Sequence, residues 1–187
     1  MFITFSAFLF VLFLAGTGGD PLAETRSDGG FLVGVYGDEN RSITCVTGSP
    51  GAQFEQVASV YVPNELGLAY VTLRFDFPAN VDLIARPLFN DLVSQVVYTD
   101  FTDGTVEWNM LFRDCPSGWI QVFSQECVLL DDMPSRIQIL GDRSLVRDST
   151  FILHDVAVVN ELSLNDPDCP NVPAVASTWG RLKSEYR

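Results

Sequence analysis

The chain has 187 residues, a formal net charge of -13, and a hydrophobic content of 47%. This length suits one domain with appendages, and the apolar content is too high for a disordered chain. A surface this acidic repels phosphate backbones and anionic membranes, which excludes nucleic acid as the expected partner. No apolar run reaches the roughly 18 residues of a membrane-spanning helix, so we expect no transmembrane segment after signal cleavage.

The first residues have the pattern of a secretion signal. Residues 2–15 are apolar except for Thr4 and Ser6, and small residues occupy positions 16–19. An apolar segment followed by small residues is what a signal peptidase recognises, although no Lys or Arg precedes it here. The alternative, an uncleaved anchor, needs a longer apolar stretch. We therefore expect a signal peptide over residues 1–19, a flexible leader over 20–30, and a secreted protein that is periplasmic, extracellular or on the cell surface.

Strand patterns begin at residue 31. In "VTLRFDF", Val71, Leu73, Phe75 and Phe77 fall on one face, and in "TVEWNMLF" the inward residues are Val106, Trp108, Met110 and Phe112. This period of two indicates strands with one solvated side. Further candidates are "FLVGVYG", "QVASVYV", "SQVVYTD", "WIQVF", "RIQIL" and "FILHDVAVV". "DFTDG" predicts a hairpin loop, and "ARPLFNDLV" has room for one or two helical turns.

Short strands at close spacing, without alternating helices, predict an all-β fold. We expect an antiparallel β-sandwich, immunoglobulin-like or cohesin-like, over residues 31–169. Residues 170–187 are then a linker and a short C-terminal tail that we expect to be helical.

The four cysteines are disulfide candidates in an exported protein. No Cys-x-x-Cys pair occurs and His154 is the single histidine, so a zinc cage is not expected. Three pairings are possible. In many sandwiches the first and last strands lie side by side and parallel, which brings Cys45 near Cys169. Cys115 then pairs with Cys127, closing a loop of about 13 residues for about 3 kcal/mol.

Acidic loops raise the question of calcium, which takes oxygen ligands. The best candidate set is Asp100, Asp103 and Glu107 in "DFTDGTVE". No loop matches the spaced EF-hand pattern, and Asp and Asn also suit ordinary turns. We therefore favour turn roles and expect no cofactor, with calcium at this set as the alternative.

No catalytic residue is predicted. His154 and Asp155 resemble half of a hydrolase triad, but neighbours on a strand point to opposite faces. Asp131 and Asp132 are adjacent, whereas glycosidase carboxylates face each other across a cleft. Trp108 and Trp119 are expected to pack within the sheets, with sugar binding as the alternative.

The tail, "STWGRLKSEYR", is basic and aromatic in an acidic chain. If it is helical, Trp179, Leu182 and Tyr186 share one face. So short a helix is not stable alone in water, so the tail must dock on its own domain, on a copy or on another protein. Trp, Tyr and Arg often carry binding energy at interfaces. The predicted partner-binding residues are Trp179, Arg181, Leu182, Lys183, Tyr186 and Arg187.

Three stretches also carry a resemblance: "GWIQVFSQECVLLDDMPSRIQILG", "LSLNDPDCP" and the tail. They resemble a loose set of uncharacterised secreted bacterial β-sandwich proteins that end in Ser/Thr-Trp-Gly-x-Leu/Ile-Lys-Ser-x-Tyr-Arg. The resemblance implies a secreted or surface protein and brings no catalytic residues.

These observations favour a secreted or cell-surface, non-catalytic module for binding or assembly. Its protein partner, or a second copy, would be held by the tail or by an open sheet edge. A carbohydrate- or calcium-binding sandwich is the first alternative, and a secreted carboxylate-dependent hydrolase is the second.

Overall fold

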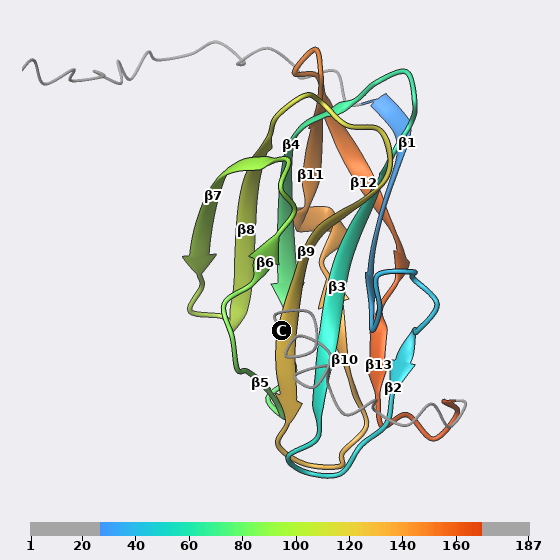
Figure 1. Cartoon of the computed structure of the whole chain (residues 1–187), viewed down its shortest axis with the longest axis vertical. Helices are drawn as coiled ribbons and strands as arrows, with labels where there is room; N and C mark the ends of the chain where they lie inside the picture. Colours follow the sequence, from blue (N-terminus) through green and yellow to red (C-terminus); the bar gives the residue numbers. More distant parts are fainter. Residues whose placement is uncertain (1–26, 170–187) are drawn as a thin grey trace, which may run out of the picture.

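The computed structural model describes residues 27–169, and these are almost entirely strands (Figure 1). The strands are β1 Ser27–Tyr36, β2 Cys45–Val46, β3 Gln53–Val62, β4 Leu68–Asp76, β5 Val81–Leu83, β6 Leu88–Phe89, β7 Val93–Asp100, β8 Thr105–Phe112, β9 Gly118–Leu129, β10 Ser135–Ile139, β11 Leu145–Asp148, β12 Leu153–Asn160 and β13 Leu162–Leu164. One 3₁₀ turn, Gly141–Arg143, precedes β11. Within the described part of the chain, no helix has the length and apolar character needed to cross a membrane.

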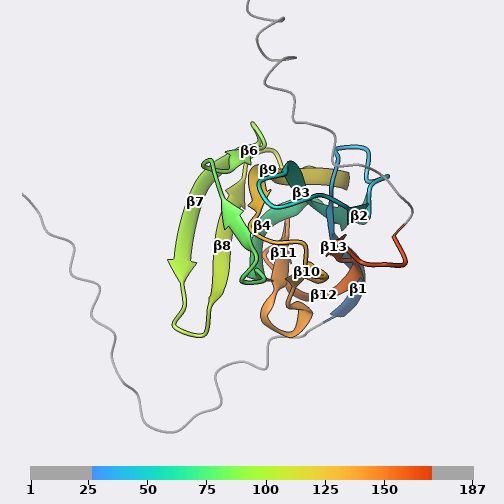
Figure 2. The ribbon, with the colours of Figure 1, turned by 90° about the horizontal axis from the view of Figure 1, so that it is seen from below.

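The strands form two layers that face each other. One layer runs β7, β8 and β4, with β11 and β10 along the other edge of β4. The second runs β12, β1, β3 and β9, with β5 and β6 along β9. Pairing of β11 with β12 joins the layers on one side, and Figure 2 shows them from below. The predicted sandwich is therefore present.

The core lies between the layers and uses the predicted inward residues. Val71, Leu73, Phe75 and Met110 are completely buried. Phe123 of the second layer contacts the rings of Phe75, Phe89 and Trp108, with ring centroids 5.5 to 5.8 Å apart. Burying each such side chain stabilises the fold by about 1.5–3 kcal/mol.

One detail of the predicted architecture is wrong. The segment "ARPLFNDLV" forms strand β6 and turns in place of a helical turn, because Phe89 packs on Trp108 and Phe123 while β6 bonds to β9. Two pairs of strands in the sandwich are parallel, β1 with β12 and β2 with β13. The parallel contact of β1 and β12 is the relation expected of the first and last long strands.

The cysteines form one disulfide in place of two. Cys45 is bonded to Cys169, with Cα atoms 5.9 Å apart, next to the parallel pair β2–β13. Cys115 and Cys127 are free thiols, so the second predicted bond does not form. The chain does not fold back after residue 123: β9 continues to Leu129, which places Cys127 about 30 Å from the start of that strand at about 3.3 Å per residue. Burial raises the pKa of the Cys127 thiol.

Several predicted segments lie outside the described residues. They are the signal peptide, the leader up to residue 26, and residues 170–187 with the expected helical tail and its six partner-binding residues.

Candidate binding face

The outer side of β7, β8, β4 and β11 is the strongest candidate site. The register sets its residues opposite one another, for example Thr72 against Asn109 and Leu145. We call this surface the open face. It consists of Val97, Thr99, Glu107, Asn109, Leu111, Tyr70, Thr72, Arg74, Leu145 and Arg147, together with Phe151 of the β11–β12 turn.

A polar network occupies the middle of the open face. The Tyr70 hydroxyl donates to Asn109 Oδ1 at 2.5 Å, and the Thr72 hydroxyl donates to the same oxygen at 2.8 Å. Asn109 Nδ2 in turn donates to Glu107 Oε1 at 2.7 Å. These bonds fix the side chains before any partner arrives, which lowers the entropy cost of binding.

Apolar side chains border this network. Phe151 is 61% exposed, Val97 50% and Leu111 37%. A shallow hollow of about 330 Å³ lies among Tyr70, Thr72, Leu111, Leu145, Arg147 and Phe151. Exposed apolar groups rimmed by polar ones are typical of interaction surfaces.

Phe151 is held in an unfavourable backbone conformation. Its φ of 64° lies in the left-handed region, where a bulky side chain is an outlier. Asp148 maintains this turn: its Oδ1 accepts from the N–H of Thr150 at 2.8 Å and of Ile152 at 3.1 Å. Arg147 Nη1 donates to the Phe151 carbonyl at 3.2 Å. Such strain, on the order of 1–3 kcal/mol, clusters at functional sites.

His154 supports the same turn from beneath. Its Nε2 lies 2.8 Å from Asp148 Oδ2, and the two side chains are only 3% and 2% exposed. Burial favours a higher pKa for Asp148, but hydrogen bonds from Thr150, His154 and Ile152 outweigh it and lower the pKa. Asp155 is exposed and points to the opposite side, as predicted. The buried His–Asp pair is therefore closed to a substrate and holds the turn.

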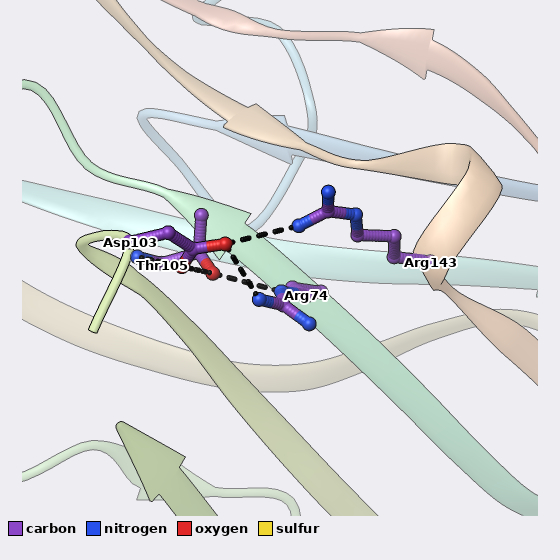
Figure 3. A network of polar contacts seen from close by, with 4 residues as sticks. All are labelled: Arg74, Asp103, Thr105 and Arg143. Atoms are coloured by element: carbon purple, nitrogen blue, oxygen red, sulfur yellow. Dashed lines mark hydrogen bonds and ion pairs between the residues drawn. The ribbon is translucent and has the colours of Figure 1, made fainter. Parts of the chain in front are cut away.

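The predicted calcium ligands do not come together. Asp103 Oδ2 lies 3.0 Å from Arg74 Nη2 and 3.1 Å from Arg143 Nη1. Figure 3 shows both arginine side chains pointing toward this carboxylate. Hydrogen bonds from Thr105, and then the two arginines, lower the pKa of Asp103. Asp100 lies on the opposite side of the sheet from Glu107, because it pairs with the inward Val106. In residues 27–169 no three His, Cys, Asp or Glu side chains are grouped to hold a metal.

Asp131 and Trp108, two further candidates, have structural roles. Asp131 accepts from Asn80 Nδ2 at 3.0 Å and from the Met133 N–H at 2.9 Å, in the turn after β9. Asp131 and Asp132 thus lie on a different loop from Asp100 and Asp103, so no facing carboxylate pair forms among them. Trp108 is 8% exposed and belongs to the core.

The outer side of β1, β3 and β9 differs from the open face. Its residues Val57 and Ser59 are completely buried, although neither belongs to the core between the layers. Tyr36 lies across Gly34, where an added Cβ would come within 2.8 Å of the Tyr36 hydroxyl. Arg41, from the loop after β1, lies 5.0 Å above the Trp119 ring. We call this surface, made of Gly34, Tyr36, Val57, Ser59, Tyr61 and Trp119, the covered face.

Comparisons with known proteins give the fold class. No family model and no curated protein matches the chain. Among solved structures, a cohesin module of a Clostridium perfringens family 33 glycoside hydrolase is 13% identical with a TM-score of 0.58, covering 72% of this chain and 96% of that one. The sixth cohesin of Acetivibrio cellulolyticus scaffoldin B, solved with a Cel5 dockerin, is 15% identical with a TM-score of 0.57, covering 73% and 98%. A non-cellulosomal cohesin from Archaeoglobus fulgidus is 10% identical with a TM-score of 0.53, covering 74% and 94%. The chain therefore has a cohesin-like β-sandwich fold.

The alternation in "VTLRFDF" places Thr72 and Arg74 on the solvated side of the strand, but it did not reveal the open face. The apolar and aromatic members that it missed are Tyr70, Leu111, Val97 and Phe151. For the strand residues, the signal was an apolar or aromatic residue at a solvent-side position of the alternation, as for Leu111 between Met110 and Phe112.

Proposed function

We propose that this chain is an extracellular, non-catalytic module that binds a protein partner through the open face. The observation that carries the proposal is the exposed Phe151, held in a strained turn beside the preorganised Tyr70–Asn109 network. The fold likeness supports it, because cohesins of this fold have been solved in complexes with dockerins. Export is inferred from the pattern of residues 1–19.

The role of the tail is a separate proposal that rests on sequence alone. Its aromatic and basic residues, Trp179 and Arg181 among them, would add a second contact to a partner. A chain ending at residue 176 that binds as tightly as the full chain would remove this role without affecting the open face.

The open face is tested by charge substitution. The full chain is immobilised, and binding of purified dockerin modules and of the secreted proteins of its own organism is measured by interferometry. Leu111→Lys combined with Phe151→Asp should weaken binding by at least about tenfold. Val159→Asp is the matched control, since Val159 is 47% exposed on β12, away from the open face. Equal binding by both variants would place the contact elsewhere.

A further inference from the structure

We propose that β7 is a strand-addition edge through which two copies of the chain pair. Within residues 27–169, β7 bonds to β8 alone, and it lies at the outer margin of the layer in Figures 1 and 2. Unpaired edges invite pairing, and proteins usually block them with Lys, Pro or a short length. β7 is eight residues long and contains neither Lys nor Pro.

The hydrogen-bonding pattern shows which backbone groups face outward. The Phe101 N–H donates to the Thr105 carbonyl at 3.0 Å, across the β7–β8 hairpin. Residues of an antiparallel strand alternate between facing one neighbour and the other. Val96, Tyr98 and Asp100 therefore direct their N–H and C=O groups away from β8.

This pattern selects one register for a symmetric pair. A two-fold axis through Val97, perpendicular to the sheet, places Val96 opposite Tyr98 of the second copy and Tyr98 opposite Val96. Each of these two pairs exchanges both N–H···O bonds. At the axis, Val97 lies opposite Val97 of the second copy as a non-hydrogen-bonded pair. Val97 and Tyr98 are 50% and 46% exposed, so both gain contacts. An aromatic residue opposite a β-branched one is a favourable cross-strand pair.

Charge makes a second copy compatible with this edge. The chain carries a net charge of -13, yet residues 94–99 carry no charge. The register sets Asp100 against Ser94, so no carboxylates lie opposite each other, which would destabilise the pair. The paired molecule would present two open faces on one side of a continuous sheet. That consequence rests on the proposed function, whereas the pairing does not.

Cross-linking tests the register. Val97→Cys in a Cys115→Ser background should give a disulfide-linked dimer under mild oxidation, because a non-hydrogen-bonded antiparallel pair has Cα atoms about 4.5 Å apart. Thr99→Cys, on the same face but opposite Gln95, should remain a monomer on a non-reducing gel. Equal cross-linking of both variants, or none from Val97→Cys, would overturn the proposal.

Sedimentation of the full chain tests the association itself. The wild type should dimerise with rising concentration, and Val97→Lys should raise the dimer Kd by at least about tenfold, because two ammonium groups meet at the axis. Leu111→Lys, one strand inward, should keep the dimer while weakening partner binding at the open face. A dimer unaffected by Val97→Lys contradicts the edge pairing. A wild type that stays monomeric up to about 1 mM also contradicts the proposal. The same holds if the monomer binds a polylysine peptide and forms no dimer.

Discussion

The two outer faces of the sandwich are built from similar strands but differ in how far their side chains are buried. On the covered face, Val57 and Ser59 are completely buried, whereas Trp119, which contacts the tilted Tyr61 ring and lies beneath Arg41, is 38% exposed. On the open face, Phe151 and Val97 stay exposed beside fixed polar groups. The middle of the covered face is thus buried, whereas apolar side chains of the open face are exposed to solvent. Residues on the covered face should control stability, and those on the open face should control binding.

The largest expected effect belongs to the support of the Phe151 turn. Asp148→Asn should cost about 2–4 kcal/mol of unfolding free energy, because it weakens a buried hydrogen-bonded network. It should also weaken partner binding. Urea unfolding measures the first effect, and Asp132→Asn, in an exposed turn, is the control expected to stay within about 0.5 kcal/mol.

The same carboxylate predicts a pH dependence. The pKa of Asp148 is lowered in the folded state from an ordinary value of 3.8, so its contribution is present above that value. It is lost as the pH falls through the folded pKa. The wild type should therefore lose more stability than Asp148→Asn on acidification. Parallel acid-unfolding curves for the two proteins would contradict this assignment.

On the covered face, Trp119→Ala should cost about 1–2 kcal/mol through lost packing against Tyr61 and Arg41. Thermal unfolding measures this loss. Binding at the open face should not change, because Trp119 lies on the other layer. A large binding loss with intact stability would reverse the roles given to the two faces.

Phe151→Asn should separate binding from stability most clearly. Asn tolerates the left-handed conformation, so we expect a gain of about 0.5–1 kcal/mol in unfolding free energy. Loss of the ring should weaken partner binding by at least about tenfold. Phe151→Ala also removes the ring, but alanine does not favour the left-handed conformation. This variant should lose partner binding with little gain in unfolding free energy. If Phe151→Asn lowers stability, the turn is not strained.

The smallest expected effect is at Arg41. Arg41→Ala should cost about 0.5 kcal/mol, which is typical of an exposed cation–π contact. It should make Trp119 more accessible to acrylamide in a Trp179→Phe background, where Trp108 is buried. Arg136→Ala, which removes an ion pair with Glu161, is the control that should leave the quenching unchanged.

Much of the scaffold was predictable because burial imposes a period of two on strands. That alternation identified the inward sides of β4 and β8, and strand order brought Cys45 to Cys169. Helix-like residues around Phe89 misled, because a contact with distant Trp108 and Phe123 decided their conformation. The sequence favoured turn roles for the acidic triplet but could not show what holds Asp103, because Arg74 and Arg143 approach it from β4 and from the turn before β11.

By itself, the sequence determined that this protein forms stacked sheets and which side chains enter the core. Only the tertiary structure decided which outer face has a buried middle, that Asp148 and His154 meet, and that β7 pairs with β8 alone within residues 27–169. Alternation along a strand separates inside from outside. It carries no information about which outward residues become buried, because the contacts that bury them join residues far apart in the chain.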